Sequence, residues 1–444
     1  MLKISLSEAE VLHQAARERI VETCAVGLVY PAGSYGGTTS HVVRDLVEVP
    51  EAAYAVRTAT AATLKPDYCI EINNRARAAE AGVFIAHTHP GVDALQGFSA
   101  VDDDGERALA DYFRHRLPAA DHFAAVVTSR HIFARHMGPS RPVLARCVGR
   151  MVTGFGENTS ADMEAYDRQV RALGEEGQRH LSTLRVAVVG LGGTGSVLVQ
   201  MLAHLGVGAF LLIDYDAVEL TNLNRLVGAT PTDVGQRKVD VAAKLVSSIN
   251  PAAAVTSVVG DVTHDSTARM LTEVDFIFGC TDSVSSRAVL NQFAYQYLVP
   301  FIDIGVGVFV HEGQVQYITG RTQMLAPGLP CLLCMDKLDA NQVRIEMLSE
   351  EQRRSDPYIT GASVPQPAVI SLNSTISSAA VTMFLAAVTG LRSDARMLIY
   401  DGIRGSLRPA AGPARPNCIV CSDEGSLARG STWQLPTRQG GDHA

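Results

Sequence analysis

The stretch LRVAVVGLGGTGS, residues 184–196, decides the fold of this 444-residue chain. An apolar, β-branched run ends in four closely spaced glycines, Gly190, Gly192, Gly193 and Gly195, and an apolar segment suited to a helix follows. The pattern predicts a buried parallel strand, a glycine turn and a helix whose N-terminus favours a phosphate. By itself, it fits any dinucleotide-binding domain.

Residues downstream of the glycines favour ATP over a redox dinucleotide. They are acidic, amide and basic residues at the ends of predicted strands and in the following loops: Asp214, Asp216, Asn222, Arg225, Lys238 and Asp282. The first two can reach a ribose. A hydride-transferring enzyme has no need of the others. An enzyme that cleaves ATP between its α- and β-phosphates uses cations to hold the triphosphate and a carboxylate to hold magnesium.

Residues of about 160–425 resemble the ThiF/MoeB/ubiquitin-activating-enzyme superfamily, which adenylates the C-terminal glycine of ubiquitin-like proteins. The resemblance rests on the glycine loop, the six residues above and the entry segment YDRQVR, residues 166–171. It implies ATP and Mg²⁺ as cofactors, bound by the glycines and those six residues, with Arg225, Lys238 and Asp282 also catalytic. It further implies a homodimer in which Arg168 of one subunit enters the ATP site of its neighbour. Without the resemblance, Arg168 would be read as a surface residue of a helix.

At 444 residues the chain is too long for one ordinary domain, and two to three domains are expected. Its composition, 47% hydrophobic and 19% charged, is that of a soluble globular protein. A net charge of -8 argues against nucleic acid or an anionic membrane surface as the main partner. The chain shows neither a charged-then-apolar leader nor, on this reading, a long uncharged apolar span. We therefore expect a cytoplasmic location.

The chain divides by composition into four segments. Residues 1–150 are expected to form a separate α/β unit, and 151–162 form a linker rich in Gly, Asn, Thr and Ser. The adenylating domain, 163–425, is expected to be Rossmann-like with a mixed sheet. Residues 426–444 are expected to be a flexible tail.

The first unit contains a metal-ligand pattern on a predicted strand, 83–90. His87 and His89 are two residues apart, so both side chains leave the same face of the strand. Ser99 and Asp102 follow at the start of a predicted helix. Two imidazoles and one carboxylate form a three-ligand set of the catalytic-zinc type, which leaves one position for water. The alternative is that the histidines are surface residues beside an acidic helix start.

These four residues, together with Glu22 in the segment VETC, resemble the JAMM/MPN family of zinc isopeptidases. The resemblance implies a cytidine-deaminase-like α/β fold. It implies His87, His89 and Asp102 as zinc ligands, Glu22 as general base and Ser99 as the residue that stabilises the transition state. The loop before Ser99 is slightly longer than the usual family spacing.

Two C-x-x-C pairs, Cys331 with Cys334 and Cys418 with Cys421, predict a four-cysteine structural zinc site. A redox dithiol would explain one pair but not two. We thus expect two zinc ions, one catalytic and one structural. No cysteine lies between Cys334 and Cys418, the interval where thioester-forming members of the superfamily keep their nucleophile. Cys280 is interpreted as a core residue.

Further elements are expected in the second domain. Residues 299–310 and the segment from 314 onward should form a strand pair with a turn at 312–313. The apolar stretch around 370–388 should be a helix in the core and at a dimer interface.

Together the two resemblances imply a fusion of a JAMM-type zinc isopeptidase with an adenylyltransferase. The protease would trim or deconjugate a ubiquitin-like protein, and the second domain would adenylate its C-terminal glycine. The acceptor would be the cysteine of a conjugating enzyme in a bacterial ubiquitin-like pathway. Alternatively, a sulfur donor would convert an activated sulfur-carrier protein to a thiocarboxylate for cofactor or metabolite biosynthesis. The intact residue sets argue against a third reading, a scaffold with an inactive site.

Overall fold

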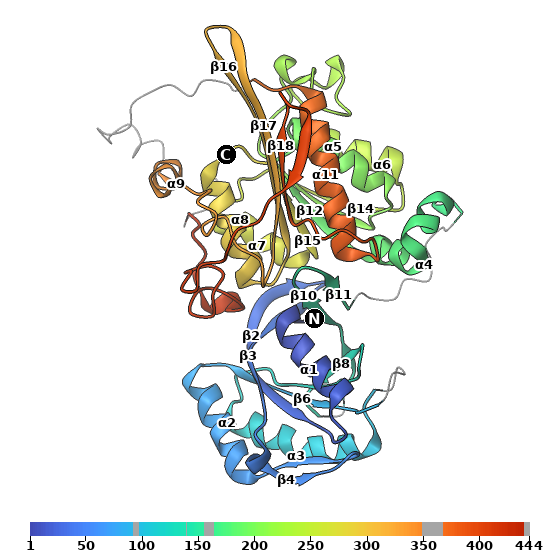
Figure 1. Ribbon diagram of the computed structural model, residues 1–444, viewed down its shortest axis with the longest axis vertical. Helices are drawn as coiled ribbons and strands as arrows, with labels where there is room; N and C mark the ends of the chain where they lie inside the picture. Colours follow the sequence, from blue (N-terminus) through green and yellow to red (C-terminus); the bar gives the residue numbers. More distant parts are fainter. Residues whose placement is uncertain (92–96, 139, 155–163, 349–366, 439–444) are drawn as a thin grey trace. The chain divides into compact units, whose positions relative to one another are not determined.

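A computed structural model describes residues 1–91, 97–138, 140–154, 164–348 and 367–438, and the chain divides into two compact units (Figure 1). The first unit comprises Met1–Phe155 with the short segments Gln296–Leu298 and Ala428–Trp433. The second unit comprises Gly156–Tyr295, Val299–Leu427 and the C-terminal residues from Gln434.

The first unit is built on a nine-stranded mixed sheet with the order β11-β10-β1-β3-β2-β6-β7-β8-β9. In chain order these strands are β1 (Leu2–Ser5), β2 (Cys24–Tyr35), β3 (Thr38–Glu48), β6 (Gly82–Thr88), β7 (Phe123–Val127), β8 (Ile132–His136), β9 (Pro142–Val143), β10 (Ala145–Val148) and β11 (Val152–Thr153). The helices are α1 (Leu6–Glu18), α2 (Pro66–Ala78) and α3 (Ala100–Arg116), and β4 (Tyr54–Arg57) with β5 (Ala62–Leu64) forms a separate hairpin.

The core of the first unit holds the central strand β6 in place. Fully buried side chains from β6 and its neighbour β7, Phe84 and Phe123, pack in one cluster with Leu2 of β1. Strand β6 pairs antiparallel with β2 and parallel with β7. Because β6 is paired on both sides and buried, its C-terminal end is a rigid place for functional side chains.

The second unit contains an eight-stranded mixed sheet in the order β14-β13-β12-β15-β16-β17-β18-β19. Its strands are β12 (Arg185–Val189), β13 (Ala209–Ile213), β14 (Ala254–Val258), β15 (Phe276–Gly279), β16 (Phe301–His311), β17 (Gln314–Leu325), β18 (Met397–Asp401) and β19 (Ser406–Pro409). The pairs β14–β13, β13–β12, β12–β15 and β15–β16 are parallel. The pairs β16–β17, β17–β18 and β18–β19 are antiparallel. The predicted mixed sheet and the strand pair with its turn at 312–313 are confirmed.

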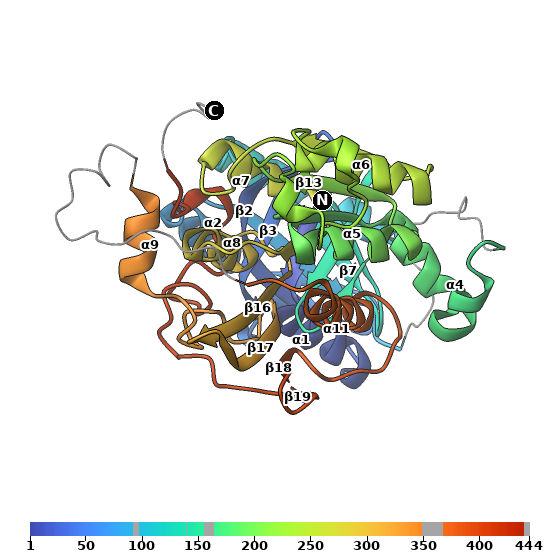
Figure 2. The same ribbon diagram turned by 90° about the horizontal axis from the view of Figure 1, so that it is seen from above.

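Helices cover the sheet of the second unit, and Figures 1 and 2 show α5, α6 and α11 gathered apart from α7 and α8. The helices are α4 (Asp167–Thr183), α5 (Gly193–His204), α6 (Lys238–Ile249), α7 (Asp265–Met270), α8 (Val284–Gln296), α9 (Ala340–Met347) and α11 (Ile370–Val388). Helix α11 contacts α5, β16 and β17. This arrangement brings α11 beside the first helix after the glycine turn.

Helix α11 corrects one expectation and confirms another. It carries no charged residue and is long and apolar enough to cross a membrane, so the chain does contain a long uncharged apolar span. The ring of Phe384 nevertheless packs edge-to-face on Phe276 and Phe278 of β15, at centroid distances of 4.9 and 5.4 Å. These contacts confirm the predicted core position of the helix.

Parts of the expected linker and tail belong to the fold. Residues Val152–Thr153 form strand β11, and most of the remaining linker lies outside the described residues. In the tail, Leu435 is buried, and the Arg438 backbone N–H donates to the Thr263 carbonyl at 2.7 Å. The stretch up to Arg438 is therefore packed rather than loose, because its apolar side chains and backbone find partners; residues 439–444 lie outside the described residues.

The glycine turn gives a test of this fold. A β-carbon on Gly195 would stand 1.9 Å from the Gly190 carbonyl oxygen, whereas one on Gly192 would meet nothing within 4 Å. Alanine favours a helix over glycine by about 1 kcal/mol, so only the clash can make Gly195→Ala destabilising. We expect Gly195→Ala to lower the stability of the second unit by about 2–3 kcal/mol and Gly192→Ala to change it by less than about 0.5 kcal/mol.

Calorimetric unfolding of the full chain measures both variants. Equal unfolding temperatures for Gly195→Ala and Gly192→Ala would show that helix α5 does not depend on this close approach.

Candidate active sites

The glycine loop of the second unit leaves backbone donors open toward a ligand. Gly190 has a φ of 88°, and a β-carbon there would stand 2.8 Å from the Cys280 carbonyl oxygen. Helix α5 begins at Gly193, and no side chain in the described part of the chain caps its N-terminus. Its first N–H groups are therefore available to an anion, which the helix dipole also favours.

Asp214, which directly follows β13, binds the backbone of this loop through its carboxylate. Its carboxylate accepts from the backbone N–H of Leu191 at 2.6 Å and of Asp216 at 2.8 Å. Burial raises the pKa of Asp214, while these hydrogen bonds and the nearby Lys238 act in the opposite direction. Asp216 is more exposed and pairs with the Lys238 Nζ at 2.6 Å. Three predicted residues thus lie together beside the loop.

Asn222 and Arg225 lie in the segment that connects β13 to α6. The Asn222 side chain accepts from the Glu219 backbone N–H at 3.1 Å and closes a short 3-10 turn. The Arg225 guanidinium donates to the Thr221 carbonyl at 2.7 Å, and its stem lies 3.2 Å from the position of a β-carbon on Gly193. The structure therefore brings Arg225 against the glycine loop, and Asn222 shapes the turn that positions it.

Asn373 of α11 is a site residue that the sequence patterns did not reveal. Its Nδ2 lies 2.2 Å from the position of a β-carbon on Gly193, and Asn373 is buried. One helical turn later, the Ser377 hydroxyl donates to the Thr194 carbonyl at 3.2 Å. No local pattern singled out these two residues. Their spacing of four places them on one face of the helix, but Ser371, Ser374, Thr375, Ser378 and Thr382 of the same helix are polar as well.

The segment after β15 brings the predicted magnesium carboxylate to the same edge of the sheet. The Cys280 backbone N–H donates to the Val189 carbonyl at 2.8 Å, and the exposed Asp282 follows two residues later. Partial burial, followed by the negative charges of Asp216, Asp261 and Asp282, raises the pKa of Tyr215 to about 12, although 57% of the residue is exposed. Burial also raises the pKa of the Cys280 thiol, although Cys280 is half-buried and is not among the fully buried core residues.

Arg168 is not brought to this group. It is exposed on the first turn of α4, and no hydrogen bond or ion pair joins it to the other candidate residues that the structure describes.

The four predicted cysteines converge in the second unit. Their sulfur atoms all lie within 4.8 Å of one another, with Cys331–Cys418 and Cys334–Cys421 separations of 3.5 Å. The Arg415 backbone N–H donates to the Cys334 sulfur at 3.2 Å. A hydrogen bond from Cys421 lowers the pKa of Cys331. Four sulfurs in this range, with a backbone N–H donor, fit a tetrahedral zinc site.

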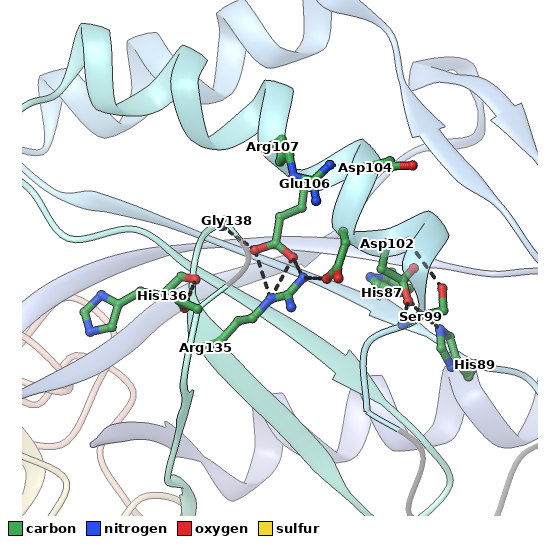
Figure 3. Close-up of polar contacts among 12 residues, drawn as sticks. His87, His89, Ser99, Asp102, Asp104, Glu106, Arg107, Arg135, His136 and Gly138 are labelled. Atoms are coloured by element: carbon green, nitrogen blue, oxygen red, sulfur yellow. Dashed lines mark hydrogen bonds and ion pairs between the residues drawn. The ribbon is translucent and has the colours of Figure 1, made fainter.

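The predicted residues of the first unit also converge, as Figure 3 shows. The His87 and His89 Nε2 atoms are 3.2 Å apart, and they lie 3.0 and 3.6 Å from the two Asp102 carboxylate oxygens. Ser99 caps α3: its hydroxyl accepts from the Asp102 backbone N–H, and its own N–H donates to the Asp102 carboxylate at 2.6 Å. The three ligand atoms fit one metal ion.

The electrostatics of this cluster suit a cation. Burial would raise the pKa of Asp102, but hydrogen bonds from His87 and His89 hold it well below its usual range. Glu22 lies two residues before the start of β2 and is buried, and its backbone carbonyl accepts from the Arg57 Nε at 3.0 Å. Burial raises the pKa of Glu22, and the two histidines partly offset that effect. Glu22 is therefore within the electrostatic field of the histidine pair without a direct bond to it.

Comparison with known proteins identifies the second unit. The model of the ThiF family matches residues 166–420 and leaves residues 1–165 outside the match. The molybdopterin-synthase adenylyltransferase of Escherichia coli K12 is 30% identical over 269 residues, which are 60% of this chain and 99% of that protein. The SAMP-activating enzyme E1 of Haloferax volcanii is 27% identical over 268 residues, covering 60% and 91%.

A third relative, the sulfur carrier protein adenylyltransferase of Thermus thermophilus, is 28% identical over 268 residues, covering 60% of this chain and 93% of that protein. The family match spans more than half of the chain and contains the glycine loop, the residues gathered around it and the first three of the clustered cysteines. The chain belongs to the ThiF family.

Proposed function

We propose that the second unit is an adenylyltransferase that activates the C-terminal glycine of a small carrier protein with ATP. One observation carries this proposal: Arg225, Asn373 and the segment leading to Asp282 all converge on the glycine loop. In the reaction, the carrier's carboxylate attacks the α-phosphorus of ATP, and the bond to the β-phosphate breaks. The products are the acyl-adenylate and pyrophosphate.

The residues around the glycine loop have different roles in the proposed reaction. The open N–H groups of the loop and of α5 bind phosphate oxygens, and Arg225 and Lys238 place positive charge where negative charge develops. Lys238 is held 2.6 Å from Asp216, so its ammonium group is oriented before a phosphate arrives. Magnesium, which the Asp282 carboxylate would hold, would neutralise charge on the triphosphate.

Sulfur-carrier proteins are the substrate class with the better support. Two of the relatives are named as the adenylyltransferases of molybdopterin synthase and of a sulfur carrier protein. No cysteine lies between Cys334 and Cys418, so this chain has no nucleophile in the interval where thioester-forming relatives place one. We therefore propose that the sulfur of a donor attacks the acyl carbon of the adenylate directly, so that a carbon–sulfur bond forms as the carbon–oxygen bond to AMP breaks. Transfer to a conjugating enzyme is the weaker alternative.

The predicted homodimer concerns Arg168, which lies apart from the other residues of the adenylating site. Arg168 is exposed on the first turn of α4 and has no ion-pair partner among the residues described. We propose that it serves the ATP site of a second copy of the chain.

A second candidate function, zinc isopeptidase, is favoured by the convergence of His87, His89 and Asp102 in the first unit. A zinc ion held by these residues would polarise a water molecule. Glu22 would take a proton from that water and deliver it to the leaving amine as the carbon–nitrogen bond breaks. The Ser99 hydroxyl would donate to the developing oxyanion.

The adenylation proposal predicts the effect of Asp282→Asn. In an ATP–pyrophosphate exchange assay with a sulfur-carrier protein ending in free Gly-Gly, the variant should lose about 100-fold or more of the activity, because the magnesium carboxylate is gone. Glu175→Gln, which removes an exposed charge on α4, is the control and should retain full exchange. No thiol-sensitive adduct between chain and carrier should appear on a non-reducing gel. Wild-type exchange by Asp282→Asn would contradict the assignment.

The isopeptidase proposal predicts that Glu22→Gln loses cleavage but keeps metal. The probe is the same carrier extended by a short peptide after Gly-Gly, followed by mass spectrometry. Removing the base should slow cleavage by about 100-fold or more, and zinc content should stay at the wild-type value. Cleavage at the wild-type rate would remove Glu22 from the mechanism.

The four-cysteine cluster predicts a structural metal. Cys331→Ser should lower the zinc content by about one equivalent and lower the unfolding temperature of the second unit, because metal binding contributes folding free energy. Cys69→Ser, at a buried cysteine outside both clusters, should leave the zinc content unchanged. Unchanged zinc in Cys331→Ser would show that the cluster holds none.

A further inference from the structure

The metal-ligand cluster of the first unit depends on the position of one helical turn. His87 and His89 come from β6 and the residue after it, whereas Asp102 comes from the first turn of α3. The buried residues of α3 are Glu106, Ala110 and Phe113, all beyond that turn. Val101, within the turn, is 66% exposed. Apolar packing therefore anchors the middle of α3 and leaves its first turn to be held by other contacts.

Those contacts come from Arg135 on β8. Its guanidinium is almost completely buried, with 7% of the side chain exposed, and it lies 2.7 Å from the Asp103 carboxylate. The same group stacks on the ring of Phe98, with the guanidinium carbon 3.6 Å from the ring centroid. Phe98 directly precedes Ser99, and Asp103 directly follows Asp102. Arg135 thus contacts the residues on both sides of the Ser99–Asp102 cap.

Arg135 is itself held in one orientation. Its Nε and Nη2 donate to both carboxylate oxygens of Glu106, at 2.7–3.2 Å, and Glu106 also accepts from the Gly138 backbone N–H. A bidentate, buried guanidinium–carboxylate pair has little rotational freedom. Phe98 also meets the His87 ring edge-on at 6.5 Å between centroids. One rigid contact chain therefore joins β8, the first turn of α3 and a histidine of the cluster.

We propose that Arg135 is a positioning residue of the first unit's metal site, which sets the distance between Asp102 and the histidine pair. The inference rests on the isopeptidase function proposed above, since it concerns the same metal site. Arg135 does not touch the metal ligands. It acts through Asp103 and Phe98, as outer residues commonly fix the ligands of a metal site.

The experiment measures the zinc affinity of the full chain by chelator competition. His87→Ala identifies the equivalent of zinc that belongs to this site and separates it from the cysteine cluster. Asp103→Asn should weaken that equivalent by about tenfold, while the unfolding temperature of the first unit stays at the wild-type value. Asp104→Asn removes the same charge one residue later, from a carboxylate that is 78% exposed and pairs with Arg107, and should leave the affinity unchanged.

Two further variants distinguish the effect of side-chain position on zinc affinity from the effect of charge. Arg135→Lys keeps the positive charge but cannot reach Asp103 and Glu106 together, so it should also weaken zinc binding by about tenfold. Asp103→Glu keeps the negative charge and should restore most of the affinity lost in Asp103→Asn. If Arg135→Lys fails to fold, the comparison of Asp103→Asn with Asp104→Asn decides alone.

The outcomes distinguish this inference from the proposed function. Equal zinc affinities of Asp103→Asn, Asp104→Asn and the wild type would overturn the role of Arg135 and leave the metal site intact. Equal zinc contents of His87→Ala and the wild type would overturn the metal site, and the role of Arg135 would fall with it.

Discussion

The close approach of Gly195 to the Gly190 carbonyl is the constraint on which the second unit depends. A β-carbon at Gly195 would lie 1.9 Å from that oxygen, so only glycine lets α5 begin so near the end of β12. Strands β13 and β15 flank β12 in parallel, so their carboxyl ends meet at the same edge. The helix N-terminus and the residues that follow the three strands therefore face one place.

The first unit reaches its site by a different physical route. Here the ligand atoms are side-chain atoms: two imidazoles from β6 and the residue after it, and one carboxylate from the first turn of α3. Side chains from two elements keep a fixed distance when both elements are held rigidly in place. Strand pairing anchors β6, and the Ser99 cap together with the Arg135 contacts anchors the first turn of α3.

The two units also differ in what supports their function. Most of the second unit lies within the ThiF match. This chain aligns with at least 91% of the length of three relatives, which are named as adenylyltransferases or as an activating enzyme. The first unit lies outside that match, and its proposed chemistry rests on the donor set itself. The two proposals meet in one substrate feature, the glycine end of a carrier protein, which a peptidase would expose and an adenylyltransferase would activate.

The sequence by itself determined the features that depend on short spacing. The glycine loop, the His87–His89 pair and the helix start near Ser99 are each defined by a few neighbouring residues, over which strand and helix periodicity dictates which side chains share a face. The C-x-x-C pairs were likewise readable. Three features were decided only by the tertiary structure. Asn373 approaches Gly193, Arg135 forms an ion pair with Asp103, and the stretch up to Arg438 packs against the fold. These contacts join residues far apart in the chain, so sheet order and helix packing create them, and no local pattern records them.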